Sequence, residues 1–143
     1  MRRPNAPRLL IAGPGPAEMW AREAQALGVQ GRVTFLGERA DVADLYRAAD
    51  LLVFHSRAEG CPNTVLEAMA SALPVVATDV AGNREAVGED GKAAWLVPAE
   101  SPAALAEAVA TLVASPALRR EVGAAARERI LERFDIDRVG ARY

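Results

Sequence analysis

The feature that most constrains the fold is a regular alternation of short, continuously apolar runs with longer segments of helical periodicity. Such runs are too uniformly apolar for strands with one solvated face, and they are typical of strands buried on both faces. The alternating order predicts an α/β, Rossmann-like fold, in which about five parallel strands form one sheet with helices on both faces. The predicted strands are residues 8–12, 32–36, 51–55, 74–78 and 93–97, and the helices between them are residues 17–27, 40–49, 62–71 and 82–87.

Two further helices close the chain, and each begins with a serine followed by a proline, at Ser101-Pro102 and Ser115-Pro116. A serine side chain caps N–H groups at a helix start, and proline suits the first helical position. Each helix is predicted to pack through one apolar stripe. The stripes are Leu105, Val109, Leu112 and Val113 in the first helix, and Leu118, Val122, Ala126 and Ile130 in the second. A length of 143 residues suits one domain spanning residues 1–143.

Charge and cysteine content exclude several classes of function. A net charge of −2 leaves no basic face for a nucleic-acid backbone or an anionic membrane surface. The single cysteine, Cys61, cannot form an internal disulfide, and the cysteine and histidine content shows no metal-site spacing. No stretch approaches the ~20 apolar residues of a membrane-spanning helix. We expect a cytoplasmic protein with no metal, no cofactor and no nucleic-acid partner.

The loop after the predicted strand 51–55 is the richest in functional residue types, and ligands of parallel sheets bind beyond such carboxyl ends. Pro62 suits the first position of a helix, whose first-turn N–H groups then lack helical partners. A phosphate group fits there, beside the positive end of the helix dipole. Gly60 has no Cβ, so a ligand can approach the backbone closely. The first-turn N–H groups are those of Asn63, Thr64 and Val65.

Two glutamates, Glu59 and Glu67, flank this helix start. Glu67 lies more than a turn inside the helix, where its carboxylate can accept hydrogen bonds from a vicinal diol. Glu59 precedes the helix and would face the other side of the phosphate. This spacing suits a nucleotide sugar, with a diol at one end and further hydroxyls at the other. The alternative is that both glutamates only form solvated surface.

A family resemblance favours the first of these interpretations. The segment RAEGCPNTVLEAMASALPVVATDVAGNREAVGEDGKAAWLVP resembles the donor-binding signature of family-4, GT-B-fold retaining glycosyltransferases, including two glutamates separated by seven residues. The similarity extends to RLLIAGPGPAE, GRVTFLGER, ADVADLYRAADLLVFHS and the closing helices, so it covers nearly all of the chain. The resemblance implies the C-terminal, donor-binding half of a GT-B enzyme.

The resemblance also implies roles for individual residues. Glu67 would hold the ribose hydroxyls, and Glu59, as the catalytic residue, would contact the donor sugar near its reacting carbon. Glu85 corresponds to a glutamate near the donor sugar, with an exposed helix face as an equal alternative. The family transfers sugars with retention, and typically without a metal. Backbone amides at Cys61, Asn63, Thr64 and Val65, next to Gly60, would hold sugar and diphosphate, and Gly37, Glu38 and Arg39 would meet the base.

Two departures from the family pattern stand out. A basic pair that usually contacts the diphosphate comes from a strand and helix before Arg8, and we expect that both this unit and the acceptor-binding N-terminal domain are missing from the chain. We therefore expect a fragment that is inactive alone, whose parent chain supplies the acceptor domain and any peripheral membrane contact. The second departure is Ala72, where glycine is usual; a positive φ there would cost on the order of 1 kcal/mol.

Several alternatives remain open from the sequence. The chain could be a non-catalytic, Rossmann-like regulatory or protein-interaction module, or a sugar-phosphate epimerase of similar architecture. A homodimer through the free edge of the first strand is a further alternative. His55 could be a base or a structural residue, and Arg57 a phosphate contact or a solvated side chain.

Overall fold

The computed structural model describes residues 6–60, 62–88 and 91–134, and the chain divides into two compact units, Met1–Val42 and Ala43–Tyr143. All strand pairs in these described ranges are parallel: β1 and β2 pair in the first unit, and the second unit has a three-stranded sheet in the order β3-β4-β5. The α/β class and the five strands are therefore confirmed. Two of these strands lie in the first unit and three in the second.

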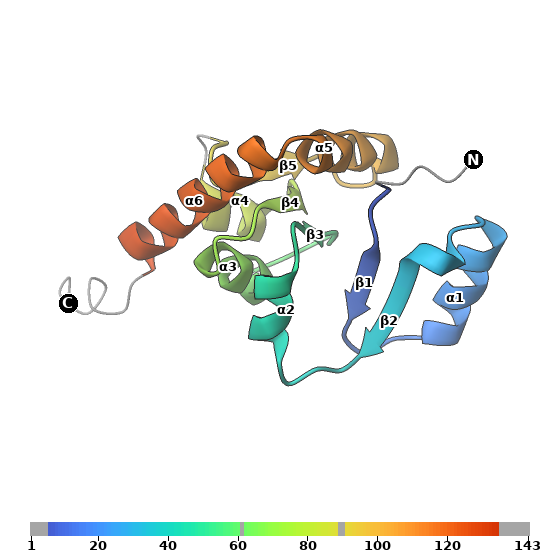
Figure 1. Cartoon of the computed structure of the whole chain (residues 1–143). Coiled ribbons are helices and arrows are strands. Elements are labelled where there is room, and N and C mark those ends of the chain that lie inside the picture. Colours follow the sequence, from blue (N-terminus) through green and yellow to red (C-terminus); the bar gives the residue numbers. More distant parts are fainter. Residues whose placement is uncertain (1–5, 61, 89–90, 135–143) are drawn as a thin grey trace. The chain divides into compact units, whose positions relative to one another are not determined.

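The first unit is a small β-α-β arrangement (Figure 1). Its parallel pairing begins with Leu9 opposite Val33, and the Gly13 N–H donates to the Gly37 carbonyl at 2.8 Å. Leu9 and Leu10 are about half exposed, so β1 departs from the expectation of a strand buried on both faces. Among the described residues of this unit, one strand and one α-helix are available to cover it. The elements are β1 (Leu9–Ala12), α1 (Ala17–Ala26), the 3-10 turn η1 (Gln30–Arg32) and β2 (Val33–Gly37).

The second unit holds most of the core, and its central strand β4 is buried along its whole length. The strand is buried as its continuously apolar sequence predicted, since it has a partner strand on each side and helices packed against it. The elements are α2 (Val42–Ala48), which begins at the boundary between the units, β3 (Leu52–Phe54), α3 (Asn63–Ala70), β4 (Val75–Thr78), α4 (Ala81–Val87), β5 (Trp95–Val97), α5 (Pro102–Ala114) and α6 (Pro116–Arg133).

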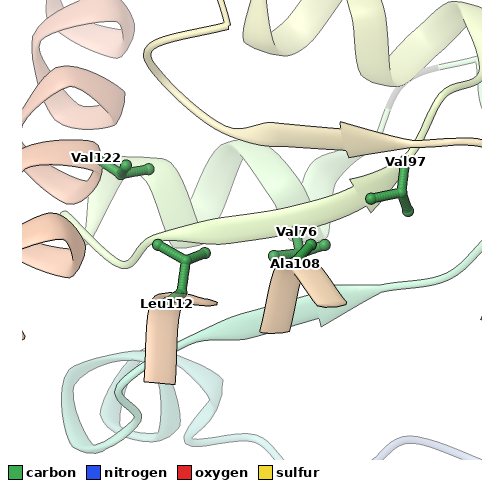
Figure 2. Packing of buried hydrophobic residues seen from close by; sticks show 5 residues of the cluster. All are labelled: Val76, Val97, Ala108, Leu112 and Val122. Atoms are coloured by element: carbon green, nitrogen blue, oxygen red, sulfur yellow. The ribbon is translucent and has the colours of Figure 1, made fainter. Parts of the chain in front are cut away.

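The two closing helices, α5 and α6, pack into the core with residues of the apolar stripes predicted for them. Figure 2 shows side chains from β4, β5, α5 and α6 converging in one cluster, made of Val76, Val97, Ala108, Leu112 and Val122. The Ser101 hydroxyl accepts from the Ala104 N–H at 3.4 Å, and the Ser115 hydroxyl accepts from the Leu118 N–H at 3.2 Å. Both predicted N-caps are confirmed. No helix in the described ranges is long and apolar enough to cross a membrane.

The turn after α3 contains a strained residue. Ala72 has a φ of 56°, the left-handed conformation that favours glycine. The Leu73 N–H donates to the Ala68 carbonyl and the Ala72 N–H to the Met69 carbonyl, both at 3.0 Å, which is the Schellman pattern. The positive φ considered from the sequence is therefore confirmed, and alanine carries its cost.

Replacing Ala72 with glycine should stabilise the fold by about 1 kcal/mol, because glycine adopts positive φ without a clash between Cβ and the backbone. Glycine also has more freedom in the unfolded chain, which offsets part of the gain. Urea unfolding of the two proteins measures the difference. A lower unfolding midpoint for Ala72→Gly would show that the side chain contributes more than its conformation costs.

Candidate functional site

The candidate site lies at the carboxyl end of β3, where residues 55–62 lead into α3. Pro62 occupies the N-cap position, and its carbonyl accepts the first intrahelical hydrogen bond, from the Leu66 N–H at 3.1 Å. The prediction of Pro62 at the first helical position is therefore wrong by one residue, because this bond makes Asn63 the first helical residue. The N–H groups of Thr64 and Val65 still lie in the first turn, at the positive end of the helix dipole.

Glu67 lies in the second turn of α3, and a buried tyrosine holds its side chain. The Tyr46 hydroxyl donates to Glu67 Oε2 at 3.0 Å. Tyr46 on α2 is 9% exposed, whereas Glu67 is exposed. Burial, together with the hydrogen bond to Glu67, raises the pKa of Tyr46 to about 12, so the hydroxyl remains a donor at neutral pH. The carboxylate is thus anchored through one oxygen while the residue faces solvent.

The sequence interpretation did not include Tyr46. The signal was present, since Val42, Leu45 and Tyr46 follow the spacing of a buried helix face. A buried tyrosine hydroxyl usually has a hydrogen-bond partner, so a polar partner is expected for Tyr46. The residue that it contacts, 21 positions away, could not be identified from local pattern.

Glu59 lies on the loop before α3, and its main chain contacts the start of α4. The Glu59 carbonyl accepts from the Gly82 N–H at 3.0 Å. Glu59 is partly buried, and Gly60 beside it is exposed. A Cβ at Gly60 would meet nothing within 4 Å, so the space beside this backbone is open to a ligand. Cys61 lies outside the described residues.

The other candidates in the second unit are on the surface. Glu85 is exposed on α4, and Arg129 Nη2 donates to its main-chain carbonyl at 2.9 Å. His55 is also exposed. Arg57 Nε lies 3.4 Å from Glu100 Oε1, and these two side chains are 82% and 69% exposed. Such an exposed pair contributes little stability, so Arg57 is a solvated side chain in this structure.

The predicted base-contacting loop, Gly37, Glu38 and Arg39, belongs to the first unit and is exposed. Gly37 ends β2 with a φ of 64°. The Arg39 guanidinium pairs with both carboxylate oxygens of Asp41, at 2.7 and 2.6 Å, and this hydrogen-bonded pair holds the pKa of Asp41 below its usual value. The Arg39 side chain is therefore paired within its own loop, and Glu38 beside it is exposed.

A separate open pocket of about 510 Å³ lies beside β5, and it contains none of the predicted site residues. An ion pair between Arg84 Nε and Asp79 Oδ1, at 2.5 Å, forms part of its lining. The pair lowers the pKa of Asp79. The lining residues are Asp79, Arg84, Gly88, Gly91, Ala94, Trp95, Leu96, Val97 and Ala108.

Sequence comparisons connect this chain to sugar-transferring enzymes. The family model described as "Glycosyl transferases group 1" matches residues 1–115. The chain is 30% identical over 137 residues to N-acetyl-alpha-D-glucosaminyl L-malate synthase of Bacillus anthracis, covering 95% of this chain and 36% of that protein. It is 37% identical over 133 residues to the lipopolysaccharide core biosynthesis mannosyltransferase LpcC of Rhizobium leguminosarum bv. viciae, covering 89% of this chain and 37% of that protein.

A solved structure closely matches the fold of this chain. The crystal structure of HepE from Anabaena in complex with UDP matches with a TM-score of 0.88 and 25% identity. This match covers 95% of the present chain and 39% of HepE. The chain therefore spans somewhat more than a third of the length of these three proteins.

Proposed function

The chain belongs to the group 1 glycosyltransferases, and from that membership we propose that it forms the donor-binding half of a glycosyltransferase and holds a nucleoside diphosphate sugar. Its α/β fold is that of the GT-B glycosyltransferases it resembles. The observation that carries the proposal is the Glu67 carboxylate, anchored by Tyr46 in the second turn of α3. An oriented, outward carboxylate is suited to accept hydrogen bonds from two neighbouring ribose hydroxyls.

The diphosphate of the donor is proposed to lie at the N-terminus of α3. The amides of residues 61, 63, 64 and 65 would donate to it there, with the helix dipole favouring its negative charge. In glycosyl transfer the diphosphate is the leaving group, so groups that stabilise its growing charge lower the barrier. Glu59 would bind hydroxyls of the donor sugar, with Glu85 as a further contact, and Gly37, Glu38 and Arg39 would meet the base.

The acceptor is proposed to bind outside this chain. Since the chain spans about a third of the length of its curated relatives, the remaining part of a parent protein has room for an acceptor-binding domain. We propose that transfer retains the anomeric configuration and requires no metal ion. On this view the chain alone binds donor but transfers no sugar.

A thermal-shift panel of UDP-, GDP- and ADP-sugars tests the proposal. UDP is the first candidate, because HepE has been solved with UDP and with UDP-glucose. A ligand at ten times its dissociation constant stabilises the fold by about 1.4 kcal/mol, which raises the melting temperature by a few degrees for a chain of this size. We expect one base to give a dose-dependent rise. An unchanged melting temperature with every member at millimolar concentration would favour the non-catalytic module.

A further inference from the structure

The loop that carries Glu59 is hydrogen-bonded to two residues, one at the end of β4 and one at the start of α4. The first is Thr78, at the carboxyl end of β4, which is 1% exposed. Its Oγ1 accepts from the Ser56 N–H at 3.1 Å, and the same hydroxyl donates to the Ser56 carbonyl at 2.5 Å. One hydroxyl therefore satisfies both main-chain groups of Ser56, where the loop leaves β3.

The second residue is Gly82, in the first turn of α4. Its N–H donates to the Glu59 carbonyl at 3.0 Å. A Cβ at this position would lie 2.4 Å from the Glu59 oxygen and 2.9 Å from the Gly60 oxygen, both far inside contact distance. Gly82 is buried. The loop can keep this position only because residue 82 has no side chain.

The turn from β4 into α4, which connects Thr78 to Gly82, contains a hydrogen bond of its own. Asn83 is fully buried, and its Nδ2 donates to the Thr78 carbonyl at 2.8 Å. This bond fixes the turn from β4 into α4, so the Thr78 hydroxyl and the Gly82 amide keep a set separation. The loop makes two further interactions within the described ranges: the Ser56 hydroxyl donates to the Ala58 carbonyl at 2.9 Å, and Arg57 forms an exposed ion pair with Glu100.

We infer that Thr78 and Gly82 are positioning residues, which set the backbone of residues 56–60 and so place the Glu59 carboxylate on the donor sugar. This inference rests on the proposed function. Neither residue need touch the ligand: both act through the main chain of Ser56 and Glu59. Their loss should therefore affect recognition of the sugar far more than recognition of the nucleotide, which is assigned to Glu67 and α3.

The test compares calorimetric affinities for UDP and for UDP-glucose in wild type, Thr78→Val, Thr78→Ser and Gly82→Ala. Valine keeps the shape of threonine but removes the hydroxyl, whereas serine keeps the hydroxyl and should restore wild-type behaviour. Alanine is a better helix former than glycine, so a defect in Gly82→Ala would come from the contact with the loop. Thr111→Val is the matched control, since the Thr111 hydroxyl donates to a main-chain carbonyl at 2.9 Å on the exposed face of α5.

We expect Thr78→Val and Gly82→Ala to lower the affinity for UDP-glucose about tenfold and to change that for UDP less than twofold. Amide exchange at residues 56–60 should be faster in both variants, with exchange in α5 and α6 unchanged. Equal weakening of both ligands, or unaltered affinity for UDP-glucose, would overturn the inference while leaving the proposed function in place. The same comparison applies to whichever nucleotide sugar the thermal-shift panel selects, with its nucleoside diphosphate. Failure of the wild type to bind any member of that panel would overturn the proposed function itself, and the inference with it.

Discussion

Replacing Glu67 with glutamine is expected to weaken the binding of UDP by tenfold to a hundredfold. Hydrogen bonds to a charged acceptor contribute about 1.5–3 kcal/mol, and the amide keeps the shape of the carboxylate while losing its charge. The fold should not change, because the Tyr46 hydroxyl can donate to the amide oxygen as it does to Glu67 Oε2. Calorimetric titration with UDP measures the loss.

Two variants sharpen this prediction. Glu121→Gln makes the same chemical change at an exposed position on α6 and should bind UDP as the wild type does. Tyr46→Phe keeps the carboxylate but removes its anchor, so its affinity should lie between those of the wild type and Glu67→Gln. Wild-type affinity in Glu67→Gln would rule out the ribose-binding role of this residue.

Replacing Gly123 with alanine should lower the free energy of unfolding by about 1–3 kcal/mol, the usual cost of overpacking. Gly123 is buried on α6, and a Cβ there would lie 2.1 Å from the Ala72 carbonyl oxygen and 3.1 Å from its carbon. Alanine is the better helix former by about 1 kcal/mol, so a net loss of stability must come from this contact. Relief of the contact requires α6 to move away from the turn that ends α3.

Urea unfolding measures this effect, with Ala124→Ser as the control. Ala124 is the next residue on α6 but is exposed, and its substitution should change stability by less than about 0.5 kcal/mol. An unchanged or higher unfolding midpoint for Gly123→Ala would show that α6 can shift at no cost, and that its close approach to Ala72 is not a constraint on the fold.

Local patterns predicted most of the fold. The predicted strand 74–78 is observed as Val75–Thr78, and the predicted helix 62–71 as Asn63–Ala70. Both serine caps form as predicted, because the capping side chain and the N–H group that it accepts from are three residues apart. Apolar runs, helical spacing and caps are readable because their causes lie within a few neighbouring residues.

The features that were missed depend on contacts between residues distant in the sequence. The Tyr46 bond to Glu67 and the Thr78 bonds to Ser56 join positions 21 and 22 residues apart. The sequence therefore predicted the start of α3 to within one residue, but not the side chains that bind Glu67 and the loop of Glu59.

A crystal structure of the chain with bound UDP tests the central claim most directly, because it locates the nucleotide without relying on a change in affinity. We predict that the ribose hydroxyls lie within hydrogen-bond distance of the Glu67 carboxylate, and that the diphosphate lies at the first turn of α3. A nucleotide bound instead in the pocket beside Trp95, with Glu67 left in solvent, would contradict the assignment of α3 as the donor site.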